Sequence, residues 1–207
     1  MPKDLVIVES PAKARTIGRI LGKNFNVEAS FGHVRDITRK GTSADVVRGL
    51  QISDGTFVPR YAIIRGKGQV VKKLKQACKQ AENIYLATDP DREGEAISWH
   101  LMEAVGMDVN KVKRIVFHEI TKPAIEEAFA SPGKLDVDLV DAQQARSILD
   151  LIVGFKLSPV LWRKVRTGLS AGRVQSVAVR MIVDKEATID EFVSEEFWNI
   201  FAFFDTE

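Results

Sequence analysis

The sequence predicts an α/β domain, in which helices flank a mainly parallel sheet, followed by a helical region. Short apolar runs of strand character lie at residues 5–8, 84–88 and 114–117, and each precedes a segment with the apolar spacing of a helix. Repeated strand–helix units of this kind favour parallel strands covered by helices. Beyond Ser131-Pro132-Gly133, helical spacing predominates.

The first unit begins with Leu5-Val6-Ile7-Val8, a β-branched run that predicts a buried strand. Ser10 then provides a helix N-cap, and Pro11 suits the first helical turn. Apolar residues line one face of this helix, and Gly22 ends it.

The next two units repeat this order. A strand predicted over 84–88 leads through a carboxylate-rich turn into a helix over 96–105. A third strand is predicted over 114–117 and is followed by a helix over 123–130.

The helical region is predicted to contain three helices. The first covers 140–153 and ends at Gly154, a short second helix starts at Ser158-Pro159, and a long third one covers 174–189. The aromatic segment 197–204 favours a strand, although the sequence offers no further strand to pair with it.

Composition excludes several classes of protein. Of 207 residues, 45% are hydrophobic and 28% are charged, which is typical of a globular chain and argues against disorder. A single cysteine, Cys78, excludes an internal disulfide and a cysteine-based zinc cluster. No apolar run reaches the ~20 residues of a membrane span, and the N-terminus lacks a secretory signal. We therefore expect a soluble, intracellular protein with no membrane partner.

The net charge of +2 says little about partners, but the charges are unevenly distributed. Residues 55–81 and 151–180 carry basic side chains and no acidic ones, whereas 82–108 is acidic apart from Arg92. These blocks are either solvated helix faces or a track for a polyanion beside a carboxylate metal site. Charge alone does not separate the two.

The strongest local signal is Asp89-Pro90-Asp91-Arg92-Glu93-Gly94-Glu95, where a predicted strand turns into a helix. Open α/β sheets bind ligands at this edge. Carboxylates at alternate positions of an extended segment point the same way, so Asp89 and Asp91 can share a cation. Hard oxygen ligands favour Mg²⁺ over zinc. The alternative is a helix N-terminus whose acids complement its dipole, which accounts for Glu93 and Glu95 but not for the two aspartates.

Glu9 occupies the equivalent position after the first strand. If the first and second predicted strands are neighbours, Glu9 faces the aspartates; otherwise it is a solvated turn residue. Lys13 lies in the first helical turn, where free amide N–H groups favour an anion. A carboxylate, a lysine and a helix N-terminus together suit a phosphodiester undergoing phosphoryl transfer.

Weaker candidates lie elsewhere. Small residues in the segment 169–176 allow close approach to phosphate and Arg173 adds charge, but simple capping by Ser170 is an alternative. Arg146 and Asp150 have the spacing of a surface ion pair. His33 either contacts DNA or lies in a turn, and Trp162 either belongs to the core or provides a surface on which bases stack. His100 and His118 are expected to have structural roles.

Five segments occur together in the order found in one family. They are LVIVESPAKA at 5–14, ATDPDREGE at 87–95, FHEIT at 117–121, LSPVLW at 157–162 and LSAGRVQS at 169–176. In these segments the chain resembles the bacterial type IA DNA topoisomerases, from residue 3 nearly to its end. The resemblance implies a Rossmann-like Toprim domain over 1–120, a connecting helix and linker over 121–135, and the helical start of the type IA DNA-binding domain over 136–207.

The resemblance also implies roles for individual residues. Glu9 takes acid–base and metal roles, Lys13 steadies the scissile phosphate, and Asp89 and Asp91 hold Mg²⁺. The residues implied to contact single-stranded DNA are His33, Arg146, Ser147, Asp150, Phe155, Trp162, Ser170, Ala171, Gly172, Arg173, Val174 and Gln175. Three positions depart from the family pattern: Ser147 and Leu151 stand where arginines are usual, and Phe155 replaces a tyrosine. Each lost arginine removes a phosphate contact.

The implied activity is ATP-independent relaxation of negatively supercoiled DNA by Mg²⁺-dependent strand cleavage, strand passage and religation. The implied enzyme is a monomer associated with the nucleoid in the bacterial cytoplasm. Family members cleave DNA with a tyrosine in a Gly-x-Ile-Thr-Tyr-x-Arg-Thr-Asp-Ser-like motif, which this sequence lacks. Tyr85 lies in a predicted buried strand, and Tyr61 lies in a basic loop far from the carboxylates. We therefore expect an N-terminal fragment with no nucleophilic tyrosine and no activity alone.

Two other functions stay open. A Toprim nuclease or a primase-like enzyme would use the same carboxylates to activate water or a 3′-hydroxyl, although segments 157–162 and 169–176 count against it. A non-catalytic nucleic-acid-binding module would keep its function without Asp89 and Asp91.

Overall fold

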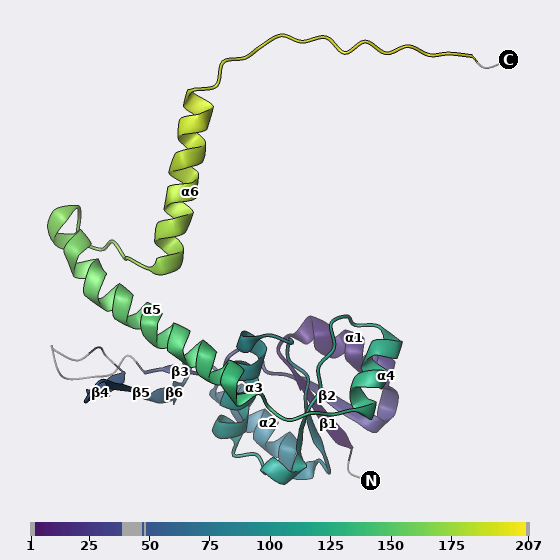
Figure 1. Ribbon diagram of the computed structural model, residues 1–207. Coiled ribbons are helices and arrows are strands. Elements are labelled where there is room, and N and C mark those ends of the chain that lie inside the picture. The colour runs from purple at the N-terminus through teal and green to yellow at the C-terminus, as the bar shows by residue number, and fades with distance from the viewer. Residues whose placement is uncertain (1–2, 39–46, 48, 206–207) are drawn as a thin grey trace. The chain divides into compact units, whose positions relative to one another are not determined.

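The computed structural model describes residues 3–38, 47 and 49–205 (Figure 1). The chain forms two compact units, residues 1–152 and 153–207, and the boundary falls within helix α5. In chain order the elements are β1 (Asp4–Val8), α1 (Pro11–Leu21), η1 (Gly22–Asn24), β2 (Phe25–Ala29), β3 (Arg35–Ile37), β4 (Leu50–Ser53), β5 (Thr56–Pro59), β6 (Tyr61–Ile63), α2 (Gly68–Gln80), β7 (Ile84–Leu86), α3 (Arg92–Val105), η2 (Val109–Lys111), β8 (Val112–Arg114), α4 (Lys122–Ala130), α5 (Val137–Lys164) and α6 (Arg173–Asp190).

A four-stranded sheet organises the first unit. Its strands lie in the order β2-β1-β7-β8, and every neighbouring pair is parallel. The side chains of Leu5 and Ile7 pack with α2 and α3 on one face of the sheet. Val6 and Val8 pack with Ile17 of α1 and with α4 on the other face. The predicted α/β class with a parallel sheet, followed by a helical region, is confirmed.

The first strand and helix form as predicted. Ser10 Oγ accepts a hydrogen bond from the Lys13 backbone N–H at 3.2 Å, and Pro11 occupies the first helical turn. Gly22 ends the helix with φ at 72°, a conformation that glycine adopts without strain.

Several later boundaries differ from the predicted ones, and the starts of α3 and β8 illustrate the reasons. Helix α3 begins at Arg92 rather than at 96, because Asp91 caps it and its Oδ1 accepts a hydrogen bond from Gly94 N at 2.7 Å. Strand β8 covers 112–114 rather than 114–117, because its partner β7 ends at Leu86, which pairs with Arg114.

Two antiparallel strand pairs, β3–β6 and β4–β5, come between β2 and β7 in the chain. They contribute to a small core that is separate from the core of the main sheet. Ile37, Val47 and Leu50 are buried there, and Ile148 and Leu151 of α5 pack against them. Leu151 stands where the family usually has an arginine. Its apolar side chain suits the contact with this apolar cluster better than a charged side chain would.

The predicted break between the first two helices of the helical region is wrong, because α5 runs through both Gly154 and Pro159. Pro159 removes one backbone N–H. The Ser158 hydroxyl donates to the Gly154 carbonyl at 2.6 Å, so this side chain bonds back to the preceding turn of the helix. Gly154 serves close packing instead of termination, since a Cβ there would come within 3.3 Å of the Ala171 carbonyl oxygen. The predicted long helix is confirmed as α6.

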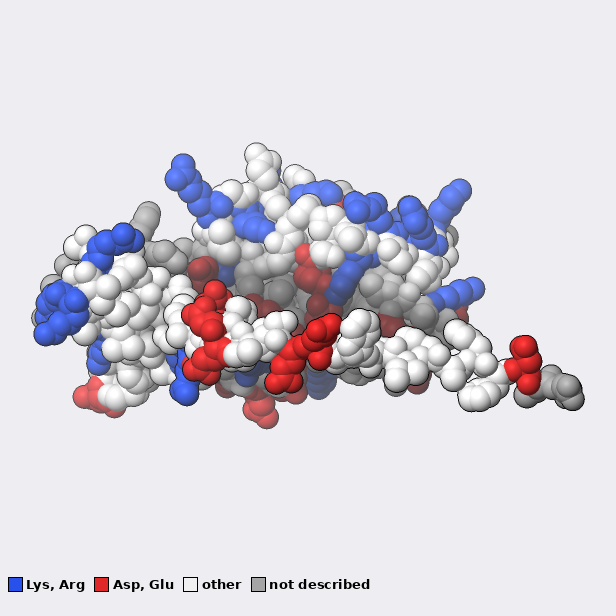
Figure 2. All heavy atoms as spheres, turned by 90° about the horizontal axis from the view of Figure 1, so that it is seen from above, with Lys and Arg blue, Asp and Glu red and all other residues white. Residues whose placement is uncertain are grey.

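The predicted strand over 197–204 is also wrong, because within the described chain residues 192–205 form neither helix nor strand. Trp198 is 83% exposed and Phe203 is 96% exposed, as strand-forming residues are when no neighbouring strand pairs with them. Figure 2 shows the aromatic run as a stretch of white spheres that ends at an acidic residue beside the grey C-terminal residues. Among the described helices, none is long and apolar enough to cross a membrane.

Candidate active site at the carboxyl edge of the sheet

Parallel pairing of β1 with β7 brings the ends of these two strands to one edge of the sheet. Leu5 pairs with Ile84 and Ile7 with Leu86, so Glu9 and Asp89 follow directly at the same edge. The condition for a shared carboxylate site, that the two strands are neighbours, is therefore met.

The Lys13 ammonium group lies between two of these carboxylates. Its Nζ forms ion pairs with Glu9 Oε1 and with Asp89 Oδ1. Burial alone would lower the pKa of Lys13, but the hydrogen bonds and charges of Asp89 and Glu9 outweigh burial and raise this pKa above its ordinary value. Lys13 is therefore a fixed positive charge at the strand edge.

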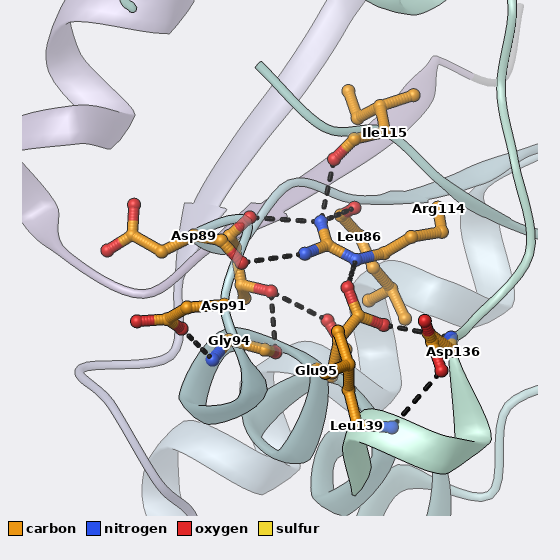
Figure 3. Close-up of polar contacts among 11 residues, drawn as sticks. Leu86, Asp89, Asp91, Gly94, Glu95, Arg114, Ile115, Asp136 and Leu139 are labelled. Atoms are coloured by element: carbon orange, nitrogen blue, oxygen red, sulfur yellow. Dashed lines mark hydrogen bonds and ion pairs between the residues drawn. The ribbon is translucent and has the colours of Figure 1, made fainter. Parts of the chain in front are cut away.

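Asp91, the other aspartate of the acidic loop, is the N-cap of α3: its carboxylate accepts a hydrogen bond from the Gly94 N–H. The first turn of α3 also lies directly on the backbone of Asp89: a Cβ on Gly94 would come within 2.0 Å of the Asp89 carbonyl oxygen. Only glycine permits this approach. In Figure 3 the carboxylates of Asp89 and Asp91 both project away from the buried side of the loop.

The side chains at this edge fit Mg²⁺ by their chemistry. Carboxylate oxygens are hard ligands, and the Glu9 oxygens are buried with no hydrogen-bond partner in the described structure beyond the ion pair with Lys13. Among the described residues, no three His, Cys, Asp or Glu side chains lie together in a group that could hold a metal ion. Of the predicted metal residues, Glu9 and Asp89 thus meet around a lysine, whereas Asp91 caps α3.

Glu95 does not belong to this edge. It is 4% exposed, and its Oε1 accepts a hydrogen bond from Arg114 Nε at 2.6 Å (Figure 3). Glu95 lies in the first turn of α3, as the dipole interpretation requires, but its side chain is buried and paired with an arginine. Sequence reasoning missed this pair, since an arginine that ends a strand carries no local sign of a partner 19 residues earlier.

His33 lies next to the acidic loop. Its Nε2 is 2.6 Å from Glu93 Oε1, and Glu93 Oε2 accepts a hydrogen bond from Gln143 Nε2 at 3.3 Å. Gln143 Nε2 also donates to Ser147 Oγ at 3.1 Å. These side chains line one side of an open pocket of about 240 Å³, which places His33 and Ser147 at a shared surface next to the acidic loop.

Arg146 and Asp150, one helical turn apart on α5, form the expected ion pair at 3.8 Å with both side chains partly exposed. The structure gives this pair the surface character that its spacing predicts. Ion pairs of this kind contribute little to stability.

His100 is the structural histidine that the sequence suggests. It is 3% exposed, and its ring packs against those of Tyr61, Trp99 and His33. Arg35 Nε donates to His100 Nδ1 at 3.3 Å. Burial, together with the charges of Arg35 and His33, lowers the pKa of His100 to about 3.

This pKa predicts a loss of stability in acid. The unfolded chain takes up a proton near pH 6.5, whereas folded His100 does so only near pH 3, so the free energy of unfolding falls as pH drops through that window. Between pH 7 and pH 5 we expect His100 to account for about 2 kcal/mol of the loss. His100→Gln should remove that part of the pH dependence in denaturant unfolding, and His118→Gln, at an exposed position, should not. Equal pH dependence in wild type and His100→Gln would contradict the burial of a neutral His100.

In the second unit, the segment 169–175 is attached to the end of α5. Trp162 Nε1 donates to the Leu169 carbonyl at 2.5 Å, and Ala171 N donates to Ser158 Oγ at 3.1 Å. Helix α6 is capped by Gly172 rather than by Ser170, so the capping interpretation of Ser170 is wrong.

The remaining DNA candidates of this unit surround that segment. Gln175 Nε2 donates to Ser170 Oγ at 3.2 Å, which closes the turn before α6. Phe155 is half-exposed, and Arg173 and Val174 occupy the exposed first turn of α6. The structure therefore holds the predicted DNA segment in one local arrangement.

Two family models and a solved structure are similar to this chain. A family model described as the Toprim domain matches residues 4–120, and with the parallel sheet and its acidic edge it defines the class of the first unit. A second family model, described as DNA topoisomerase, matches residues 134–207. The crystal structure of full-length topoisomerase I from Thermotoga maritima is similar to 91% of this chain, with 46% sequence identity and a TM-score of 0.73. The chain belongs to the type IA DNA topoisomerase family, and it spans 31% of the length of that relative.

Proposed function

We propose that this chain provides the metal-binding and acid–base part of an active site that cleaves and reseals one strand of negatively supercoiled DNA. The observation that carries the proposal is the meeting of Glu9, Lys13 and Asp89 at one edge of the sheet. Phosphodiester transfer requires positive charge to stabilise the reacting phosphate and a carboxylate to move a proton, and this cluster holds both.

Each residue has a separate part in this proposal. Lys13 stays protonated and binds a non-bridging phosphate oxygen, while Glu9 transfers a proton to or from the hydroxyl group that leaves or attacks. Glu9, Asp89 and Asp91 are the residues that would hold Mg²⁺, which when bound supplies further positive charge. Transesterification exchanges one phosphate ester for another, so the reaction needs no ATP.

The nucleophile has to come from a residue other than the two tyrosines of this chain. Tyr85 is 9% exposed, and its ring packs against Phe25 and Phe129. Tyr61 donates its hydroxyl hydrogen bond to Gln144 at 3.0 Å, and burial raises its pKa to about 12. An attacking phenol needs an accessible oxygen and a nearby base. Plasmid relaxation by a chimera with the rest of a family member, with and without Glu9, tests the proposal.

DNA binding by the basic block 151–180 makes a separate prediction. Arg163 and Lys164 are exposed near the end of α5. If the block follows the phosphates of single-stranded DNA, affinity should fall with salt by a log–log slope of about −0.7 for each phosphate neutralised. Arg163→Gln with Lys164→Gln should make that slope shallower by about 1.4 in titrations of a fluorescent oligonucleotide. An affinity that does not change with salt would instead assign the block to a solvated face.

A further inference from the structure

One buried guanidinium group determines the shape of the acidic loop. Arg114 is 3% exposed, and its Nη1 donates to the carbonyls of Leu86, Thr88 and Ile115 at 3.0, 2.9 and 2.6 Å. Its Nη2 donates to the Asp89 carbonyl at 2.8 Å (Figure 3). The backbone from the end of β7 to Asp89 is therefore wrapped around this side chain, while the Asp89 carboxylate points away from it.

The same residue is connected to the beginning of α5. Glu95 accepts from Arg114 through Oε1 and from the Asp136 backbone N–H through Oε2, at 2.6 and 3.1 Å. Asp136 Oδ1 in turn accepts from Leu139 N at 3.1 Å in the first turn of α5. Arg114 and Gly133 also exchange two backbone hydrogen bonds, at 3.0 and 2.7 Å. Side chain and main chain thus both link β8 to the segment that enters α5.

We propose that Arg114 is a positioning residue: its guanidinium group holds the loop that carries Asp89 and Asp91 directly, and through Glu95 it fixes the first turn of α5 in the same arrangement. The proposal rests on the proposed metal role of the two aspartates. Its consequence is that metal binding at the loop and the placement of the N-terminal half of α5 depend on one buried ion pair.

The chemistry of arginine supports a positioning role over simple stabilisation. A buried ion pair is often no more stabilising than apolar residues of similar volume. The planar guanidinium, however, presents five N–H donors in a fixed fork, and here it serves four carbonyls and one carboxylate. A lysine offers three donors from one atom and cannot reach acceptors on both sides of the loop.

The test uses the whole 207-residue chain with Arg114→Lys, which keeps the charge but loses the fork. We expect amide hydrogen exchange to rise at least tenfold at Gly94 and Leu139 and to stay within twofold in β1. The Mg²⁺ association constant, measured by calorimetry, should fall at least tenfold while the circular dichroism spectrum is retained. Glu95→Gln keeps one acceptor for Arg114 but loses the acceptor for Asp136, so exchange should rise at Leu139 and not at Gly94.

The matched control is Arg180→Lys, the same substitution in the exposed ion pair with Asp184 on α6, and it should change none of these quantities. Unchanged exchange at Gly94 and Leu139, or an equal rise in β1, would overturn the positioning role. Unchanged Mg²⁺ affinity in a variant with raised exchange at the loop would overturn its link to the metal. If the wild-type chain itself does not bind Mg²⁺, the proposed metal function fails, and the exchange pattern still decides whether Arg114 couples the loop to α5.

Discussion

Alanine at both Asp89 and Asp91 is expected to abolish Mg²⁺ binding by this chain. The two carboxylates leave the loop on its exposed side, and Asp89 lies next to Glu9 across the Lys13 ammonium group. Without the aspartates, Glu9 is the one carboxylate of the proposed set that remains, and its charge is already paired with Lys13. Because Mg²⁺ requires several oxygen ligands and gives up water reluctantly, a single paired carboxylate does not hold it.

Calorimetric titration with Mg²⁺ measures this loss, and circular dichroism verifies that the variant is folded. Glu126→Ala with Glu127→Ala makes the same change in net charge on α4 and should leave the Mg²⁺ affinity unchanged. Wild-type affinity in the aspartate double variant would remove the metal site from this edge of the sheet.

The second large effect concerns Glu9. In a chimera in which this chain is followed by the rest of the Thermotoga maritima enzyme, relaxation of supercoiled plasmid is expected, and Glu9→Gln should slow it by about 10²- to 10⁴-fold. Glutamine keeps the size of the side chain but cannot transfer a proton, so the loss reports acid–base chemistry. Affinity for single-stranded DNA should change much less than the rate.

Glu28→Gln is the matched control. Like Glu9, Glu28 is a glutamate in an ion pair with a lysine, here Lys73 at 2.5 Å, and it lies on β2, the strand next to β1. It should leave relaxation at the level of the unmodified chimera. A Glu9→Gln chimera that relaxes plasmid at the normal rate would show that Glu9 has no acid–base part in the reaction.

Local signals in the sequence predicted the parts of the fold that depend on nearby residues. The run Leu5-Val6-Ile7-Val8, the Ser10 cap and Gly22 correctly define the first strand and helix because each feature acts within a few residues. The acidic loop after the second predicted strand was also identified from spacing alone. Its position beside Glu9 required only that these two strands be neighbours, a condition that the sequence left open and the pairing of β1 with β7 meets.

Features that depend on distant partners could not be predicted in this way. Arg114 and Glu95 are 19 residues apart, and their pairing follows from the order of strands in the sheet. The sequence predicts a helix end at Gly154, but this residue lies inside α5 and packs closely against Ala171, a residue beyond the end of that helix. The aromatic run 197–204 shows the opposite error: its strand propensity is high, but propensity without a neighbouring strand does not make a sheet.

Trapping of covalent protein–DNA adducts tests the central claim most directly, namely that this chain holds the metal and acid–base residues but not the nucleophile. With Mg²⁺ and a labelled single-stranded oligonucleotide, the 207-residue chain should form no adduct, and the chimera should form one on a tyrosine outside this chain. An adduct mapped to Tyr61 or Tyr85 would contradict this account. So would Mg²⁺-dependent hydrolysis of DNA by this chain alone, which would identify a nuclease.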